Sequence, residues 1–394
     1  MSVGATFRTQ DRDNGLVGIT NGGTARSVND DDGNLGFGKG DVVAAVAKAT
    51  HDLELQWRDF GVFSRFSYFY DQAAADASRL EDRLTGGVQS DPGRRLAAVS
   101  RGEDEYELGP EGRDRLESQV ELLDLFAYAR FNIADRPASV RFGKQVVSWG
   151  ESTFIQNGIN SINPIDVARI RAPGAELKEA LLPTALLWTT MQVADGLSME
   201  AVWMTSYERT RIDPRGSFFS TNDFVSDDGN KAIVSFGRRN DDNNAFDPTA
   251  PPGTFSAWVP REQSGKTEDA TRQFGVTLRY FSEALNGTEF GFYYLNYHSR
   301  TPLVSGIRGA ATNPGNLAAA TCSEDAAAAG CRAGYFAEYP SDISLYGISF
   351  NTDGPWGVAL QGEYSYRPEQ PVQISGTEVL LATLGVPSST LAPA

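Results

Sequence analysis

The chain has two histidines that could act in catalysis, His51 and His298, and the second lies in the polar run Tyr297-His298-Ser299-Arg300. A histidine beside a serine could act as a general base in acyl hydrolysis. A lone histidine near a strand end is more often a structural residue. We therefore expect no enzyme activity and no cofactor.

Two acidic stretches have the composition of calcium-binding loops, residues 29–34 (Asn-Asp-Asp-Asp-Gly-Asn) and residues 240–244 (Asn-Asp-Asp-Asn-Asn). Both lack the spaced glutamate that completes an EF-hand loop. We interpret them as solvated loops, with calcium binding as the alternative, and the sequence assigns no metal ligand.

The only two cysteines, Cys322 and Cys331, are separated by eight residues in an Ala/Gly-rich stretch. This spacing favours a disulfide that closes a small loop in an oxidising compartment, and two free thiols are the alternative. A metal site is disfavoured because neither histidine is near in sequence.

The formal net charge of −16 and the isoelectric point near 4.7 provide no basic patch for nucleic acid, which we exclude as a partner. Acidic loops suit a surface that binds divalent cations or lies among lipopolysaccharide headgroups. No run of 18 apolar residues is present, so the sequence predicts no transmembrane helix.

Alternation of apolar and polar residues predicts five strand pairs, each joined by a tight turn. A lone strand at about 2–9 precedes the pairs, which lie at about 41–57 and 61–71, 117–133 and 138–149, 184–193 and 198–211, 273–280 and 289–297, and 342–351 and 356–367. Polar connections of about 30 to 55 residues join one pair to the next. Asn286-Gly287 is the strongest hairpin signal among the turns.

Short turns alternating with long polar loops are typical of a transmembrane antiparallel up-and-down β-barrel in the bacterial outer membrane. We predict an all-β chain with one domain over residues 1–394, about eleven strands and long extracellular loops. Because bacterial barrels close with an even number of strands, more strands are expected in the complete protein. The absence of a basic, apolar leader and of a final aromatic strand indicates a piece that lacks its signal peptide and C-terminal strands. A soluble β-sandwich is disfavoured by the loop lengths.

The connection over residues 147–183 differs from the others because it is rich in Ile, Leu and Phe. An apolar loop is unstable in water, so we expect residues 149–183 to fold into the lumen, with Phe154, Ile155, Ile159, Ile162, Ile165 and Ile170 against the inner wall. Asp166, Arg169, Arg171 and Glu176 would pair with lumen charges. The predicted plug residues are Trp149, Glu151, Phe154, Ile155, Asn157, Asn160, Ile162, Asn163, Pro164, Asp166, Arg169 and Arg171. Further lumen charges are expected at Arg65, Arg130, Arg141, Arg279 and Arg367, interleaved with Asp124, Glu200, Glu289 and Glu363.

The runs Trp-Gly-Glu-Ser-Thr-Phe, Asn-Gly-Ile-Asn-Ser-Ile-Asn-Pro-Ile-Asp and Arg-Ala-Pro-Gly-Ala-Glu-Leu-Lys-Glu all lie in this connection. They resemble the core of the proteobacterial domain-of-unknown-function 1302 family (DUF1302), and the similarity spans essentially the whole chain. The resemblance implies an exported outer-membrane barrel that moves lipids, sterols or other apolar compounds. It also implies a periplasmic partner of lipoprotein-carrier type and an RND-type exporter, and it supplies no catalytic residue.

The function expected from these observations is an outer-membrane channel or transport component for hydrophobic molecules. A general diffusion porin, favoured by the lumen arginines, and a structural or adhesin-like surface barrel are the alternatives. The apolar stretch at residues 377–386 is predicted either as a short helix that caps the pore or as lumen packing or a truncated strand.

Overall fold

The structure is a computed structural model. It describes residues 1–75, 108, 110–152, 158–240, 247–251, 256–262, 270–308 and 333–385. Both cysteines, Cys322 and Cys331, lie outside the described residues, as do residues 241–244 of the second acidic stretch.

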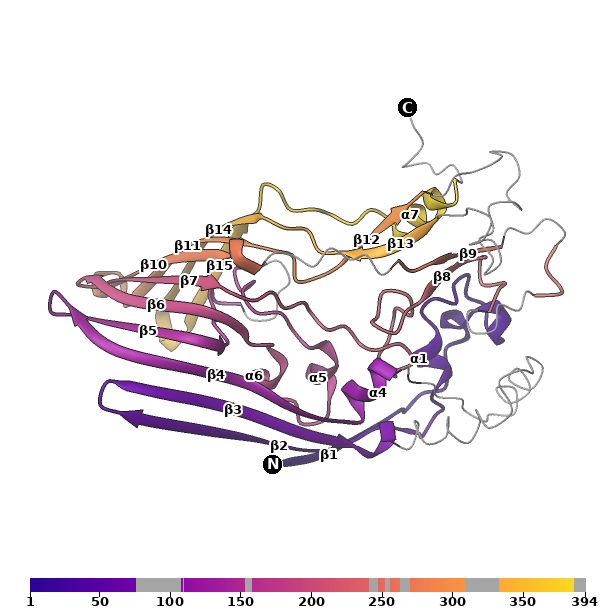
Figure 1. Ribbon diagram of the computed structural model, residues 1–394, viewed down its shortest axis with the longest axis horizontal. Coiled ribbons are helices and arrows are strands. Elements are labelled where there is room, and N and C mark those ends of the chain that lie inside the picture. Colours follow the sequence, from indigo (N-terminus) through magenta and orange to yellow (C-terminus); the bar gives the residue numbers. More distant parts are fainter. Residues whose placement is uncertain are drawn as a thin grey trace.

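One antiparallel sheet of eleven strands dominates the molecule, and its strands follow one another in chain order (Figure 1). The strands are β1 (Ser2–Phe7), β2 (Val42–Trp57), β3 (Phe60–Asp71), β4 (Ser118–Ile133), β5 (Arg136–Gln145), β6 (Thr184–Ala194), β7 (Leu197–Met204), β10 (Phe274–Ser282), β11 (Thr288–Tyr297), β14 (Ile343–Asp353) and β15 (Ala359–Tyr366). The prediction of a nearly all-β chain with about eleven antiparallel strands is confirmed.

The tight turns gather at one end of the sheet and the long connections at the other (Figure 1). At the turn between β10 and β11, Asn286 and Gly287 have φ angles of 56° and 68°. This left-handed backbone is the conformation that the Asn-Gly pair tolerates best, which is why the pair is a hairpin signal.

Two of the predicted strands end earlier than expected. Strand β5 stops at Gln145 rather than at residue 149, and β7 stops at Met204 rather than at residue 211. Beyond β7 the backbone leaves the sheet, and the Arg211 amide donates a hydrogen bond to the Ile165 carbonyl at 2.9 Å. Tertiary contacts with the 149–183 connection therefore replace sheet pairing where the sequence still alternates.

The two faces of the sheet differ sharply in exposure. On β10, Gly275 and Thr277 are buried whereas Phe274, Val276 and Leu278 are exposed, as the alternation predicts. We call the exposed side the outer face; across β7, β10, β11, β14 and β15 its exposed apolar side chains are Trp203, Phe274, Val276, Leu278, Tyr280, Phe292, Tyr346, Ile348, Phe350, Leu360, Tyr364 and Tyr366. The opposite side is the inner face. An apolar outer face is compatible with the wall of an outer-membrane β-barrel.

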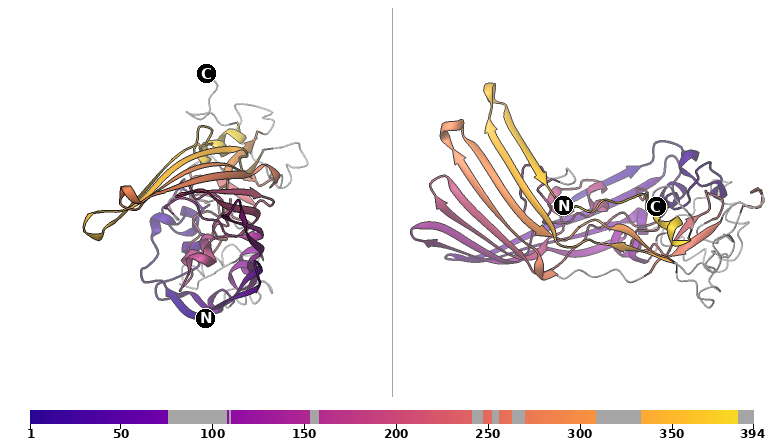
Figure 2. Two further views of the ribbon diagram at one scale, coloured as in Figure 1. Left: turned by 90° about the vertical axis from the view of Figure 1, so that its left-hand side faces the viewer. Right: turned by 90° about the horizontal axis from the view of Figure 1, so that it is seen from above.

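Viewed along its strands, the sheet is a curved, open wall (Figure 2). Strands β1 and β15 are the two ends of the strand order among the described residues. Barrel closure, which the sequence analysis expects from further strands, stays a prediction. Within the described part of the chain, no helix is long and apolar enough to cross a membrane.

The long connections carry short elements that alternation does not predict. Two small hairpins, β8 (Lys231–Val234) with β9 (Ala257–Pro260) and β12 (Leu303–Ile307) with β13 (Gly334–Glu338), pack together with helix α7 (Gly376–Thr383). Their buried core consists of Ala232, Val234, Ala257, Val259, Ala333, Tyr335, Leu380 and Leu384. Residues 377–383 of the apolar stretch are thus helical, and their helix packs on these hairpins.

The remaining described helices are short. They are α1 (Asp32–Leu35), α4 (Pro110–Leu116), α5 (Val167–Arg171) and α6 (Leu177–Ala180), with 3₁₀ turns η1 (Asn14–Leu16), η2 (Ile19–Asn21), η3 (Ala270–Arg272), η4 (Glu283–Leu285) and η7 (Pro355–Gly357). Helix α1 lies in the first acidic stretch, which was predicted to be a solvated loop. That prediction is wrong for Asp31, which is completely buried and lies against Gly18, Asn21 and Asp223.

Candidate functional site: a segment on the inner face of the sheet

Residues 149–183 belong to the connection between β5 and β6, and we call them the inner segment. Their described part, residues 149–152 and 158–183, lies on the inner face of the sheet. Helices α5 and α6 belong to it (Figure 1). Residues 153–157, and with them the predicted plug residues Phe154, Ile155 and Asn157, lie outside the described residues.

The apolar side chains of the inner segment pack into the sheet. Trp149, Ile159 and Ile162 are almost wholly buried, in one cluster with Val147, Leu186, Val202, Met204, Tyr293, Leu295, Tyr297, Ile343 and Leu345. These partners project from the inner face of β6, β7, β11 and β14 or from their ends. The inner segment is therefore part of the same hydrophobic core as the sheet, which fixes its position.

Two glycines on the sheet make room for this packing. A Cβ atom on Gly275 would lie 2.8 Å from the Trp149 ring, and one on Gly347 would lie 2.8 Å from Ile159 Cγ1. Both distances are too short for any side chain. At these two positions, which we call glycine slots, the sheet surface has room for side chains of the inner segment only because the residue is glycine.

Glu363, on β15, binds the backbone of the inner segment directly. Its Oε2 accepts hydrogen bonds from the amides of Glu151 at 2.8 Å and Ser152 at 3.1 Å, and its Oε1 accepts one from the Ile159 amide at 3.0 Å. The Glu151 carboxylate in turn accepts a hydrogen bond from Ser349 Oγ at 3.2 Å. A carboxylate that accepts three amide hydrogen bonds holds residues 151, 152 and 159 against the sheet.

Arg367, which directly follows β15, reinforces this attachment. Its guanidinium donates to the Gly158 carbonyl at 2.5 Å and to Ser161 Oγ at 3.0 Å, and also to Tyr297 Oη at 2.9 Å. Glu363 and Arg367 were predicted as lumen charges that satisfy other charges. The structure shows Glu363 bound to backbone amides of the inner segment, and Arg367 bound to the Gly158 carbonyl and to hydroxyl groups.

Asn163 joins the beginning and the end of the connection. Its Oδ1 accepts a hydrogen bond from the Val147 amide at 2.8 Å, and its Nδ2 donates to the Leu182 carbonyl at 3.0 Å. The neighbouring Pro164 carbonyl accepts the Leu182 amide at 2.8 Å. The buried side-chain amide of Asn163 therefore connects Val147 to Leu182 and closes the connection into a loop on the inner face.

The tryptophan of the inner segment shares an acceptor with the wall. The indole nitrogens of Trp149 and Trp188 both donate to Glu200 Oε2, at 3.1 and 3.0 Å. Arg279 pairs with Glu200 at 3.4 Å and with Glu289 at 3.1 Å. A chain of polar contacts therefore runs along the inner face from the inner segment toward the tight turns.

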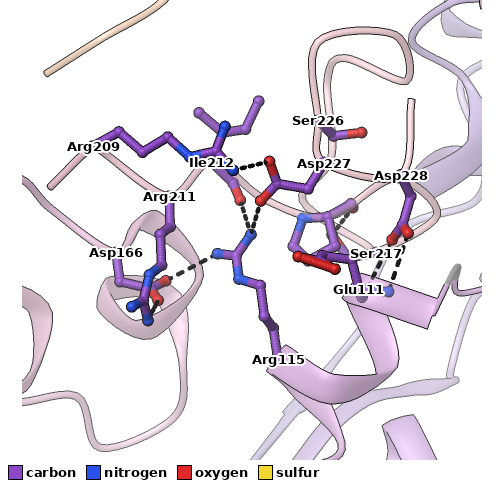
Figure 3. A network of polar contacts seen from close by, with 12 residues as sticks. Glu111, Arg115, Asp166, Arg209, Arg211, Ile212, Ser217, Ser226, Asp227 and Asp228 are labelled. Carbon is purple, nitrogen blue, oxygen red and sulfur yellow. Dashed lines mark hydrogen bonds and ion pairs between the residues drawn. The ribbon is translucent and has the colours of Figure 1, made fainter. Parts of the chain in front are cut away.

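Asp166 is the centre of a charge network that ties α5 to the loop after β7 and to α4 (Figure 3). It caps α5 by accepting the Arg169 amide at 3.3 Å, and it pairs with Arg115 at 3.4 Å and Arg211 at 3.8 Å. Arg115 also donates to the Ile212 carbonyl at 2.9 Å.

The arginines of α5 extend this network to the sheet. Arg169 pairs with Glu121 at 2.5 Å, and Arg171 pairs with Asp213. Burial raises the pKa of Asp213 to about 6, against the opposing effect of the Arg171 charge. The side of the inner segment that carries α5 is thus held by charges, whereas the side that carries Trp149 and Ile159 is held by apolar packing.

Several residues that the sequence predicted for the site do not attach the inner segment to the sheet. Ile170 is 37% exposed rather than packed on the wall, because α5 is anchored through its charged residues. Asn160 is partly buried, and Glu176 is exposed at the start of α6. Sequence reasoning missed Glu179 of α6, which forms an ion pair with Lys48 and accepts a hydrogen bond from Thr50 at 2.7 Å on β2.

His298 is completely buried, and its Nδ1 accepts a hydrogen bond from the Asp342 amide at 3.1 Å. Its ring packs near Tyr207. These contacts fit the structural role that the sequence analysis favours.

Two cavities border the inner face. The larger, of about 790 Å³, lies at the tight-turn end, and its lining includes Arg130, Ser139, Thr190, Ser198, Arg279 and Glu289. The smaller, of about 100 Å³, lies between α5 and strands β2 and β3, and its lining includes Val43, Val46, Phe69, Ala168, Phe218 and Phe219. The first is open and has a mixed polar and apolar lining, and the second is lined by apolar side chains together with charged ones such as Lys48, Arg169 and Asp213.

A family model described as "Protein of unknown function (DUF1302)" matches residues 1–392. No curated protein matches the chain significantly. Among solved structures, the crystal structure of Acinetobacter baumannii OccAB1 is similar, with 9% sequence identity and a TM-score of 0.26. That match covers 82% of this chain, which spans 60% of the length of the OccAB1 chain.

Proposed function

This chain belongs to the DUF1302 family, and we propose that it forms the wall of an outer-membrane channel or transport component that passes hydrophobic molecules. The observation that carries the proposal is the attachment of the inner segment to the inner face by Glu363, Asn163 and the Trp149 cluster. In a closed barrel, a segment held in this way would lie across the lumen. It would then constrict the passage and prevent free diffusion.

Two further observations support a membrane channel. The outer face presents aromatic and aliphatic side chains to its surroundings, which suits contact with lipid in the bacterial outer membrane. The inner face carries charges that pair with one another, such as Arg279 with Glu200 and Glu289, as a polar lumen requires.

The apolar class of cargo follows from the family resemblance. Lipids, sterols or other apolar compounds are the expected cargo. Since such molecules need carriers in water, we include a periplasmic partner of lipoprotein-carrier type and an RND-type exporter in the proposal. Outer-membrane lipid and lipopolysaccharide would surround the barrel.

A diffusion porin is the second candidate, and one observation favours it. The open cavity of about 790 Å³ at the tight-turn end is lined by Arg130 and Arg279 and by several hydroxyl groups. Because the same lining includes Asp59 and Glu289, this charged, open vestibule would admit small hydrophilic solutes. The two candidates differ in whether the inner segment leaves a hydrated path, which a transport assay can decide.

The test uses vesicles that contain the complete protein and enclose delipidated albumin as a trap for apolar cargo. A fluorescent fatty acid is added outside, and its capture by albumin is followed, with osmotic swelling in a small sugar measured in parallel. We expect the protein to accelerate capture at least several-fold over empty vesicles without sugar-dependent swelling. Rapid swelling with no gain in capture would contradict the proposal and favour a porin.

Glu363→Ala is the informative variant for this assay because it removes the three amide acceptors that hold the inner segment. We expect it to increase sugar-dependent swelling by loosening the segment. Glu369→Gln is the matched control, since it removes a carboxylate charge at an exposed position just beyond the same strand. Equal swelling rates in the two variants would show that the inner segment is not the barrier to sugar permeation.

A further inference from the structure

Three carboxylates from distant parts of the chain meet in the long-connection end of the molecule. Asp31 and Asp32 lie at the start of α1, and Asp223 lies in the connection that follows β7. One carboxylate oxygen from each residue lies within 4.8 Å of the others. This cluster is separate from the inner segment and has no part in the function proposed above.

The burial of these groups is unusual for carboxylates. Asp31 is 0% exposed and Asp223 is 4% exposed. Asp31 Oδ2 accepts hydrogen bonds from the Gly18 amide at 2.7 Å and from Asn21 Nδ2 at 2.9 Å. Burial raises the pKa of Asp31 to about 7, and burial beside two other carboxylates raises the pKa of Asp223 as well.

Several oxygens of the cluster lack a partner. Asp31 Oδ1 and both carboxylate oxygens of Asp223 are buried and receive no hydrogen bond of good geometry from the described part of the chain, although the Asp32 backbone amide lies close enough to Asp223 to oppose the rise of its pKa. A buried carboxylate without donors is strongly disfavoured unless a cation or a proton compensates it. The unpartnered oxygens belong to side chains that meet at one point, which is the arrangement that a bound cation would satisfy.

The charge of the cluster indicates the valence of that cation. Arg215 forms an ion pair with Asp32 at 2.5 Å. Among the described residues, its guanidinium is the positive charge paired with the cluster. Three carboxylates and one guanidinium leave two negative charges to be balanced. A divalent ion would neutralise them.

We propose that Asp31, Asp32 and Asp223 form a calcium site that joins the connection between β1 and β2 to the connection after β7. Calcium suits the site because it prefers carboxylate and carbonyl oxygens and accepts irregular geometry, whereas magnesium demands a near-octahedral shell. Carbonyl oxygens are close at hand. A Cβ atom on Gly33 would lie 2.3 Å from the Ser217 carbonyl oxygen and 3.2 Å from those of Phe218 and Ser220.

The site would fasten together connections that emerge from strands far apart in the sheet order, β1 and β2 on one side and β7 on the other. The expected consequence is a calcium-dependent rigidity of the long-connection end. Asp32 carries its ion pair with Arg215 as well, so Asp31 and Asp223 are the main ligands.

The test is calorimetric titration of the complete, chelator-treated protein in detergent with CaCl₂, and with MgCl₂ as the comparison. We expect one Ca²⁺ per chain and at least tenfold weaker binding of Mg²⁺. Asp223→Asn and Asp31→Asn should each weaken Ca²⁺ binding at least tenfold. Asp30→Asn is the matched control, because it removes the same charge from an exposed neighbour and should leave the affinity unchanged.

Thermal unfolding provides a second readout that a purely structural carboxylate would not give. In chelator, Asp223→Asn should unfold at a higher temperature than the wild type because an uncompensated buried charge is removed. In excess Ca²⁺ the order should reverse, since only the wild type gains from the ion. Absence of saturable Ca²⁺ binding in the wild type, or equal binding in Asp223→Asn and Asp30→Asn, would overturn the proposal.

Discussion

Single polar side chains determine where the inner segment lies. Asn163 bonds to both ends of the connection, and Glu363 bonds to three amides on either side of residues 153–157. Each satisfies backbone groups that would otherwise be buried without partners, a situation that native structures avoid. These residues specify one arrangement of a connection that has little regular secondary structure.

The substitution Asn163→Ala tests whether this one side chain fixes the arrangement of the connection. The substitution leaves the Val147 amide and the Leu182 carbonyl without their partner, so we expect a loss of about 2–3 kcal/mol in the free energy of unfolding. Asn160→Ala, at a partly buried position three residues away, should change it by less than about 0.5 kcal/mol. Chemical unfolding in detergent measures both, and equal effects would contradict the role assigned to Asn163.

Sequence reasoning identified some of these residues and not others. Asn163 and Trp149 were predicted because they lie in the unusual connection itself. The role of Glu363 could not be predicted, since its partners precede it by more than 200 residues and no alternation pattern encodes that contact. The buried state of Asp31 was also missed, because one of its neighbours, Asp223, is far away in sequence.

At the scale of elements, period-two alternation located every strand of the main sheet. It located strand ends poorly where tertiary contacts compete with pairing, as at Gln145 and Met204. The hairpins β8–β9 and β12–β13 were not predicted because strands of four or five residues offer too little alternation. Their stability comes from packing against α7, which local sequence does not reveal.

The fit between the sheet and the inner segment depends on glycine slots, and Gly275→Ala tests it. The added Cβ would lie 2.8 Å from the Trp149 ring and should displace it, with a destabilisation of about 1–3 kcal/mol. We expect the near-ultraviolet circular dichroism of the buried tryptophan to weaken. Gly376→Ala is the control because nothing lies within 4 Å of the added atom, and it should be nearly neutral.

At the scale of the whole molecule, the sheet has an apolar outer face and an inner face that carries a fixed segment. Closure into a barrel would make that segment a constriction, and this is the central claim of the proposed function. The segment can be removed without straining the wall. Gln145 and Thr184 are paired in the register, so residues 146–151 and 181–183, nine in all, suffice to connect their strands.

The measurement that tests the claim most directly is single-channel conductance of the complete protein in planar bilayers, compared with a variant that lacks residues 152–180. We predict a wild type that is silent or nearly so and a deletion variant with large, steady channels, because the constriction would be gone. A large and steady wild-type current that the deletion leaves unchanged would contradict the account.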